Sequence, residues 1–350
     1  MPEKPSPVGE YITALKNSDR FGPQVVACRT FPAIDARTAK NARVFPGGLT
    51  DLLEAMGISA LYSHQAEAIE LIQQGDDVLI STPTASGKSL IYNLPVFATL
   101  LENPQARALY LFPLKALAQD QARAITAMGE LLSGQPAFPR ILSSIYDGDT
   151  TAYQRKKIRE SLPAILITNP DMLHLSLLAY HEIWGHLFAN LTHVIIDEVH
   201  TYRGVFGSHM AWVLRRLQRI CHLYGADPVF VLSSATVGNP TELGRNLLGR
   251  QVRVVTRSGA PQGARHVILL QPQDSAAGCG TMLLDAALHR NLRTIVYTQS
   301  RKMTELITMW STRRLKGRRQ EGKIASYRAG FLPEDRRAIE EKLASGELLG

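Results

Sequence analysis

Short apolar runs, separated by helix-compatible stretches, recur through the middle of the chain. The runs that predict strands cover residues 78–80, 108–112, 141–145, 165–168, 194–197, 229–233 and 252–255. Strands that alternate with helices are typical of βαβ units, in which the strands pair in parallel. The pattern therefore predicts an α/β protein built on a doubly wound, mostly parallel sheet.

The regions on either side of this pattern predict the domain boundaries. Residues 1–48 are rich in proline and weakly periodic, with a short helix expected around 11–16, and we expect an N-terminal extension lying on the first domain. Residues 49–258 are predicted to form that first, ATP-binding domain, and residues 259–265 are a linker by composition. A second βα pattern places a strand at 266–270, a helix at 282–289, a strand at 294–298 and another helix opened by Gln299, Ser300 and Arg301. Residues 266–350 are therefore predicted to form a partial second domain.

The loop after the first predicted strand has the composition of a phosphate-binding turn. Its residues are Pro83, Thr84, Ala85, Ser86, Gly87, Lys88 and Ser89. A strand, a tight loop and a helix start together present backbone N–H groups and the positive end of a helix dipole to a polyphosphate. Gly87 would let the backbone approach ATP, Lys88 would lie against the β- and γ-phosphates, and Ser89 would bind Mg²⁺. The first glycine of the general pattern is Thr82 here, and an ordinary Gly-Lys-Ser turn is the alternative interpretation.

Polar residues follow the other predicted strands, and a parallel sheet brings such strand ends to one rim. They include Pro113 and Lys115, then Thr168, Asn169 and Asp171, then Asp197, Glu198 and His200, and finally Ser234 and Thr236. Asp197 could hold the Mg²⁺ bound by Ser89, while Glu198 could orient and deprotonate an attacking water. A solvated acidic pair at a strand end is the alternative.

Gln65 lies shortly before the phosphate loop in sequence. A carboxamide can pair with N6 and N7 of adenine, as a base selector requires. The alternative is a surface glutamine at the start of a helix.

Charge and cysteine content limit the classes of binding partner and the cellular compartment that fit the sequence. The 350 residues carry a formal net charge of +8, with a pI near 9.4. This favours an anionic partner, with nucleic acid ahead of membrane because no basic amphipathic helix stands out, although charge alone fits a basic protein without such a partner equally well. Cys28, Cys221 and Cys279 form no C-x-x-C pair, which argues against a zinc site or a disulfide framework. With no signal-peptide core or membrane-length apolar run, we expect a cytoplasmic protein.

Four of these motifs, taken in order, resemble those of superfamily 2 helicases of the DEAD/DEAH-box kind. They are Gln65, residues 83–89, Asp197-Glu198-Val199-His200 and Ser234-Ala235-Thr236. The resemblance implies two RecA-like domains with ATP between them and a single nucleic-acid strand across their top. It also implies that the loops containing Pro113, Lys115, Thr168, Asn169 and Asp171 contact the strand's backbone, that Ser234 and Thr236 couple hydrolysis to movement, and that His200 lies between the two sites.

Longer matches narrow the family further. These segments are similar to those of MrfA/YprA-type DNA helicases, which are related to the fungal Hrq-type enzymes. They are Leu61-Tyr62-Ser63-His64-Gln65, residues 82–89, residues 109–113 with 115–121, and Tyr327-Arg328-Ala329-Gly330. The similarity implies ATP-dependent 3′ to 5′ movement on single-stranded or tailed DNA and a role in DNA repair, with Gln299 and Arg301 in a loop that faces nucleic acid. An RNA remodeller, or a module that binds nucleotide and nucleic acid without hydrolysis, remains an alternative.

The chain reaches Gly350 where the family continues into a further strand and two more motifs, one of which supplies an arginine finger. We therefore expect an incomplete motor that binds ATP and hydrolyses it poorly.

Overall fold

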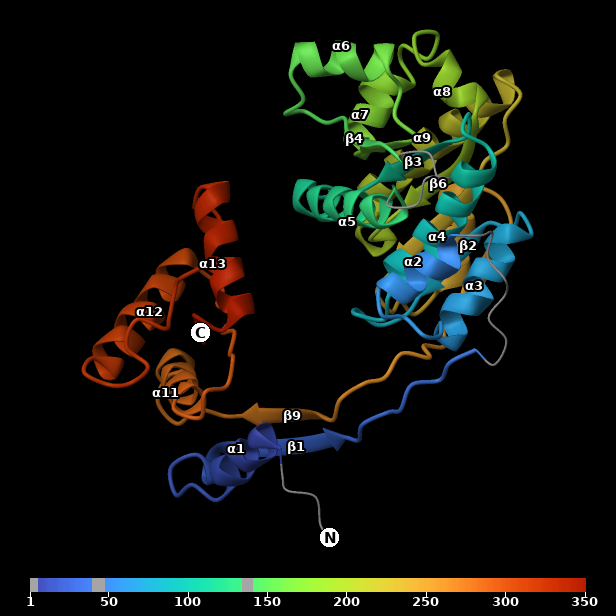
Figure 1. Cartoon of the computed structure of the whole chain (residues 1–350). Helices are drawn as coiled ribbons and strands as arrows, with labels where there is room; N and C mark the ends of the chain where they lie inside the picture. Colours follow the sequence, from blue (N-terminus) through green and yellow to red (C-terminus); the bar gives the residue numbers. More distant parts are fainter. Residues whose placement is uncertain (1–5, 40–47, 134–140) are drawn as a thin grey trace. The chain divides into compact units, whose positions relative to one another are not determined.

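Seven strands from the middle of the chain form one sheet in which every neighbouring pair is parallel (Figure 1). The computed structural model describes residues 6–39, 48–133 and 141–350. The strands are β2 (Val78–Ser81), β3 (Arg107–Leu111), β4 (Ser143–Ile145), β5 (Ile165–Thr168), β6 (Leu191–Ile196), β7 (Val229–Ser234) and β8 (Arg253–Val255). Their order across the sheet is β4-β5-β3-β6-β7-β2-β8. The prediction of a doubly wound parallel sheet is confirmed.

Side chains that alternate along these strands build a separate apolar core on each face of the sheet. In β2, Ile80 packs into one core and Leu79 into the other, because successive side chains of a strand point to opposite faces. The first core is covered by α2 (Leu49–Ala55), α3 (Ser63–Gln73), α4 (Lys88–Glu102) and α5 (Lys115–Ser133). The second is covered by η2 (Leu173–Leu177), α8 (Gly185–Ala189), α9 (Gly204–Leu223) and α10 (Pro240–Leu248).

The parallel arrangement fixes where the functional loops lie. All seven strands run in the same direction, so the segments after β2, β3, β5, β6 and β7 leave from one rim. The chain passes from β2 to β3 across two intervening strands, whereas β6 and β7 are adjacent and lead back toward β2. Ligands of open parallel sheets bind outside the carboxyl ends of strands near such a change of direction.

The chain divides into two units by its contacts, Ala33–Gly263 and the combination of Met1–Pro32 with Ala264–Gly350. In the second of these, β1 (Val25–Phe31) pairs antiparallel with β9 (Arg265–Leu270), and Cys28 lies opposite Ile268. The Tyr11 hydroxyl, from α1 (Pro7–Lys16), donates to the Leu283 carbonyl of α11 (Ala276–Leu288) at 2.9 Å. The expectation that the N-terminal segment lies on the first domain is therefore wrong for residues 6–32, since backbone pairing joins them to β9. Residues 1–5 and 40–47 of that segment lie outside the described residues.

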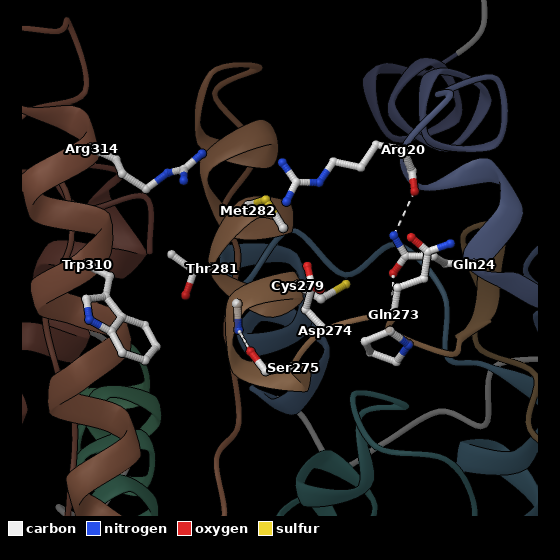
Figure 2. A pocket seen from close by; sticks show the side chains of 12 residues that line it. Arg20, Gln24, Gln273, Asp274, Ser275, Cys279, Thr281, Met282, Trp310 and Arg314 are labelled. Atoms are coloured by element: carbon white, nitrogen blue, oxygen red, sulfur yellow. Dashed lines mark hydrogen bonds between the residues drawn. The ribbon is translucent and has the colours of Figure 1, made fainter.

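A cavity of about 300 Å³ opens in this unit beside the first turn of α11 (Figure 2). Gln24, which is buried, ends η1 (Gly22–Gln24); its amide nitrogen donates to the Arg20 carbonyl at 2.7 Å and its amide oxygen accepts from the Gln273 backbone at 3.4 Å. Arg314 of α12 (Arg301–Leu315) lies on the opposite wall. Gln24 thus connects the N-terminal segment to the β9–α11 loop.

Residues 294–298, predicted as a strand, form no strand in the structure. The Thr294 N–H donates to the Leu349 carbonyl at 2.8 Å, but the rest of the segment lacks the repeated backbone pairing that defines a ladder. Ile295 is 62% exposed and Tyr297 90% exposed. The predicted helix at 282–289 is part of α11, and α13 (Pro333–Ser345) follows α12. The apolar core of this unit contains Leu284, Leu288, Ile307, Leu315 and Leu349.

Two short elements and one longer helix complete the description: η3 (Val199–Thr201), α7 (Pro170–Met172) and α6 (Ala152–Glu160), the last with no buried residue. Among the helices in the described ranges, none is both long enough and apolar enough to cross a bilayer.

A buried ion pair holds the edge of the sheet opposite to the loop-bearing rim. Asp77, only 8% exposed, precedes β2 and is bound by Arg250 through two guanidinium nitrogens, one of them at 2.8 Å. The same carboxylate accepts the Phe230 N–H of β7 at 2.8 Å, and the Arg250 guanidinium lies 4.9 Å from the centre of the Phe230 ring. Asp77 therefore ties β7, β2 and the segment before β8 together.

We predict that Asp77→Ala lowers the free energy of unfolding of the 33–263 unit by about 2–4 kcal/mol, because it leaves the Phe230 N–H without its acceptor and removes one of the two carboxylates that bind Arg250, the other being exposed Asp227. Urea denaturation followed by tryptophan fluorescence in a Trp310→Phe background measures this, since Trp184 and Trp212 both lie in that unit. Glu160→Ala is the control, because it removes only an exposed partner of Lys156 at 3.7 Å and should cost less than about 0.5 kcal/mol. Equal effects of the two substitutions would contradict the structural role of Asp77.

Candidate nucleotide-binding site

The turn between β2 and α4 has the backbone geometry of a phosphate loop. Ala85 and Gly87 both have left-handed backbones, with φ of 60° and 75°. A Cβ at Gly87 would lie 2.5 Å from the amide nitrogen of Gln65, so only glycine fits without displacing that side chain. The Thr82 and Ser86 hydroxyls, both buried, are hydrogen-bonded at 2.8 Å across the turn. Thr82, at the position of the first glycine in the general pattern, therefore braces the loop from within.

Lys88, the first residue of α4, folds back over this loop. Its Nζ donates to the carbonyls of Thr82 at 3.0 Å and Pro83 at 2.9 Å. Burial lowers the pKa of Lys88, and the nearby charges of Asp197 and Glu198 counteract that effect. The ammonium group therefore lies where the loop and the two carboxylates converge, and its present acceptors are neutral carbonyls that an anion could replace.

Asp197 and Glu198 follow β6, which is separated from β2 by β7 alone. Glu198 has φ of 52°, and its N–H donates to a carboxylate oxygen of Asp197 at 2.9 Å. Tyr92 of α4 has a pKa raised well above its usual value, first by burial and then by the charge of Asp197. The acidic pair is half-buried and its charges act on Lys88 and Tyr92 of α4, while its catalytic role stays a prediction.

His200 connects the acidic pair to the loop after β7. Its Nδ1 lies 3.1 Å from a carboxylate oxygen of Glu198 and 3.4 Å from the Ser234 hydroxyl. Ser81 at the end of β2 donates to the Ala235 carbonyl at 3.3 Å and accepts the Val237 N–H at 3.1 Å. Ser234 is buried, whereas Thr236 is exposed. The end of β2 and the loop after β7 are thus joined directly.

Gln65 is 4% exposed, which excludes the surface alternative. Its amide oxygen accepts the Tyr62 N–H at 2.9 Å, and its amide nitrogen donates to the Gly87 carbonyl at 3.0 Å. One N–H and one lone pair of the carboxamide remain for another partner. Recognition of adenine by Gln65 stays a prediction, and the side chain also has a second role in holding the phosphate loop.

The rim residues predicted to contact nucleic acid divide into two kinds. Thr168 is buried and donates to the Tyr146 carbonyl, and the side chain of Asn169 accepts the Met172 N–H at 2.9 Å as the cap of α7. Asp171 is exposed, and Lys115 forms an exposed ion pair with Asp149 at 2.7 Å. Thr168 and Asn169 thus shape their loop, while Lys115 and Asp171 face solvent beside half-buried Pro113.

Gln299 and Arg301 belong to the other unit. Both are exposed at the start of α12, whose N-terminus is capped by Ser300 through the Met303 N–H at 3.2 Å. Their contact with nucleic acid stays a prediction.

The oxygen atoms of Asp197 and Ser89 are suitable ligands for a Mg²⁺ ion that is bound by protein and phosphate together. Within the described residues, no three His, Cys, Asp or Glu side chains are grouped closely enough to hold a metal by themselves. Mg²⁺ is commonly bound by one or two protein oxygens together with substrate phosphates and water, and the Asp197 carboxylate and Ser89 hydroxyl are oxygen ligands of that kind. The residues present therefore fit the ion.

Sequence reasoning missed His64, although it lies inside one of the matched motifs. This side chain has no exposed surface and contacts the Ser86 carbonyl at 3.0 Å. Its other partner, Gly259, lies 195 residues further along the chain, so no local pattern could reveal the contact.

Comparison with known proteins agrees with this geometry. The curated ATP-dependent helicase YprA of Bacillus subtilis strain 168 is 43% identical over 91% of this chain and 43% of its own length. The ATP-dependent helicase HRQ1 of Saccharomyces cerevisiae is 35% identical over 97% of this chain and 32% of its own. A crystal structure of the DUF1998 helicase MrfA bound to DNA superposes with a TM-score of 0.91 and 41% identity, over 97% of this chain and 48% of that one.

These relatives are longer proteins, and the chain spans less than half of the length of each. The likeness confirms the RecA-like fold class and the expected resemblance to YprA, Hrq-type and MrfA helicases. The family model for the DEAD/DEAH box helicase matches residues 62–243, which include the phosphate loop, the acidic pair and the loop after β7. The chain therefore belongs to the DEAD/DEAH box helicase family.

Proposed function

We propose that this chain carries the ATP-driven chemistry of a DNA helicase that moves 3′ to 5′ along single-stranded DNA and acts in DNA repair. The observation that carries the ATP part is that the Lys88 loop after β2 and the Asp197–Glu198 pair after β6 leave the same rim of the sheet, with only β7 between the two strands. Direction and repair are supported by the sequence resemblance to MrfA/YprA-type helicases. A cytoplasmic setting belongs to the same proposal and is supported by three cysteines that are all free thiols.

In the proposed reaction each residue has a distinct electrostatic task. Lys88 exchanges its carbonyl acceptors for the β- and γ-phosphates of ATP and neutralises their charge. Glu198 orients the attacking water and accepts its proton, and His200, 3.1 Å away, holds the Glu198 carboxylate in place. Mg²⁺, when bound at Asp197 and Ser89, supplies charge neutralisation of the phosphates. Ser234 and Thr236 couple this site to the strand-binding loops.

DNA as the polymer is supported by two independent features. The net charge of +8 favours a polyanion. The MrfA structure with TM-score 0.91 is bound to DNA. We assign contacts with the sugar-phosphate backbone of DNA to Pro113, Lys115 and Asp171 in the 33–263 unit, and to Gln299 and Arg301 in the other. The predicted contact of Thr168 is wrong, because its side chain is buried and donates to the Tyr146 carbonyl, and Asn169 caps the loop that carries Asp171.

We predict that Lys88→Ala weakens binding of a fluorescent ATP analogue by at least about tenfold, because it removes charge-assisted hydrogen bonds to the phosphates. Equilibrium titration with Mg²⁺ present measures the dissociation constant. Lys156→Ala is the matched control, because it removes an exposed lysine of α6 and should leave binding unchanged. Undiminished affinity in Lys88→Ala would reject the nucleotide site.

We further predict that Glu198→Gln binds ATP as the wild type does but loses about 10²-fold in DNA-stimulated phosphate release, because the amide cannot accept the proton of the attacking water. Phosphate release is measured without polymer, with single-stranded DNA and with single-stranded RNA of the same length. Stimulation of the wild type by RNA alone would favour an RNA remodeller. Tight ATP binding without release under any of the three conditions, both in this chain and in a version extended to the length of its relatives, would favour a module that does not hydrolyse ATP.

A further inference from the structure

His64 has both ring nitrogens in use inside the protein. The Gly259 backbone N–H donates to Nδ1 at 3.1 Å, and Nε2 lies 3.0 Å from the Ser86 carbonyl. A backbone N–H can only donate and a carbonyl can only accept, so Nδ1 is the acceptor and Nε2 carries the proton. Burial, together with the charge of Lys88, lowers the pKa of His64 and favours this neutral form. The ring is therefore a bridge with one fixed tautomer.

One end of the bridge sets the orientation of the phosphate loop. In a trans peptide the C=O and the following N–H point in opposite directions. With the Ser86 carbonyl directed at His64 and the Gly87 carbonyl at Gln65, the N–H groups of Gly87 and Lys88 are directed away from α3. These are the N–H groups that a phosphate would bind in a loop of this type. His64 thus holds one of the two peptides that have to point the right way.

The other end lies in the segment 256–263 that ends the same unit. Gly259 fits closely: a Cβ there would lie 2.4 Å from the Ser63 hydroxyl and 2.6 Å from the Arg37 carbonyl. The Gly259 carbonyl also accepts the Arg37 N–H at 2.8 Å. The backbone at Gly259 therefore has little freedom to shift without pulling on the imidazole. The Tyr62 ring, 6.1 Å away and nearly parallel, supports the imidazole from one side.

We infer that His64 is a positioning residue that couples the backbone at Gly259 to the phosphate loop at Ser86, so that moving Gly259 lowers the affinity for a nucleoside triphosphate. The inference rests on the proposed nucleotide site and adds a coupling to it. The chain passes from the segment 256–263 directly into the other unit at Ala264. A displacement of the backbone at Gly259 would therefore be transmitted to the phosphate loop by the His64 side chain.

Two variants separate the two ends of the bridge. An asparagine amide reaches the position of Nδ1 and a glutamine amide that of Nε2. His64→Asn therefore keeps an acceptor for Gly259 and loses the donor to Ser86, and we expect an ATP dissociation constant about five- to tenfold higher, the size of one hydrogen bond. His64→Gln keeps a donor for Ser86 and should recover most of that loss. Melting temperatures of both variants check that the chain remains folded.

A double-mutant cycle tests the coupling itself. Gly259→Ala should weaken ATP binding several-fold in the wild type and have almost no further effect in His64→Asn, where the link to Ser86 is already cut. Gly263→Ala is the matched control, because its Cβ would have no atom within 4 Å. Independent, multiplicative effects of the two substitutions, or wild-type affinity in folded His64→Asn, would overturn the inference. Unchanged affinity in Lys88→Ala would instead reject the nucleotide site on which it rests.

Discussion

The parallel register of β6, β7 and β2 is the constraint on which the candidate site depends. Ser81 lies opposite Ser234, so β2 and β7 end at the same level, and Ile196 lies opposite Leu232, so β6 ends two residues earlier and is followed by Asp197 and Glu198. Neighbouring strands are about 4.8 Å apart, and the loops after β2 and β6 are therefore separated by roughly 10 Å. That distance allows a lysine on one loop and carboxylates on the other to act on the same small anion. Asp77 at the opposite edge holds this register through Arg250 and the Phe230 N–H.

The capacity of the phosphate loop to bind an anion depends more on the direction of its peptide N–H groups than on any single charge. Lys88 supplies the cation, but the loop becomes an anion site only if its N–H groups face outward together. The sequence provides for this from α3, where adjacent residues His64 and Gln65 bind adjacent carbonyls of the loop. The left-handed backbone at Gly87 makes that alignment possible, and its missing Cβ leaves room for the Gln65 amide.

Features that are encoded locally in the sequence could be placed correctly, whereas contacts with distant partners could not be predicted. The strands, Lys88 and the Asp197–Glu198 pair follow from short patterns, because a buried strand and the loop that ends it are encoded together. His64 depends on Gly259, and the N-terminal segment depends on β9, so neither had a local signal. Residues 294–298 show the opposite failure: their β-branched and aromatic composition is typical of a strand, but a strand also requires a paired neighbour. The predicted nucleic-acid contacts stay predictions for the same reason, since they depend on a partner molecule.

The hydrogen bonds around the phosphate loop imply that a change there is transmitted in two directions. One route leaves through Ser81, whose hydroxyl binds both the Ala235 carbonyl and the Val237 N–H, and reaches the loop after β7. The other leaves through the Ser86 carbonyl and His64 and reaches Gly259. Both routes consist of short, buried or half-buried contacts, in which a lost partner is costly because water cannot replace it. In the proposed motor, the first route would report the nucleotide to the strand-binding rim and the second to the end of the unit. Because the first route begins at Ser81, at the end of β2, and the second at Ser86, in the turn that follows, substitutions could weaken one and leave the other intact.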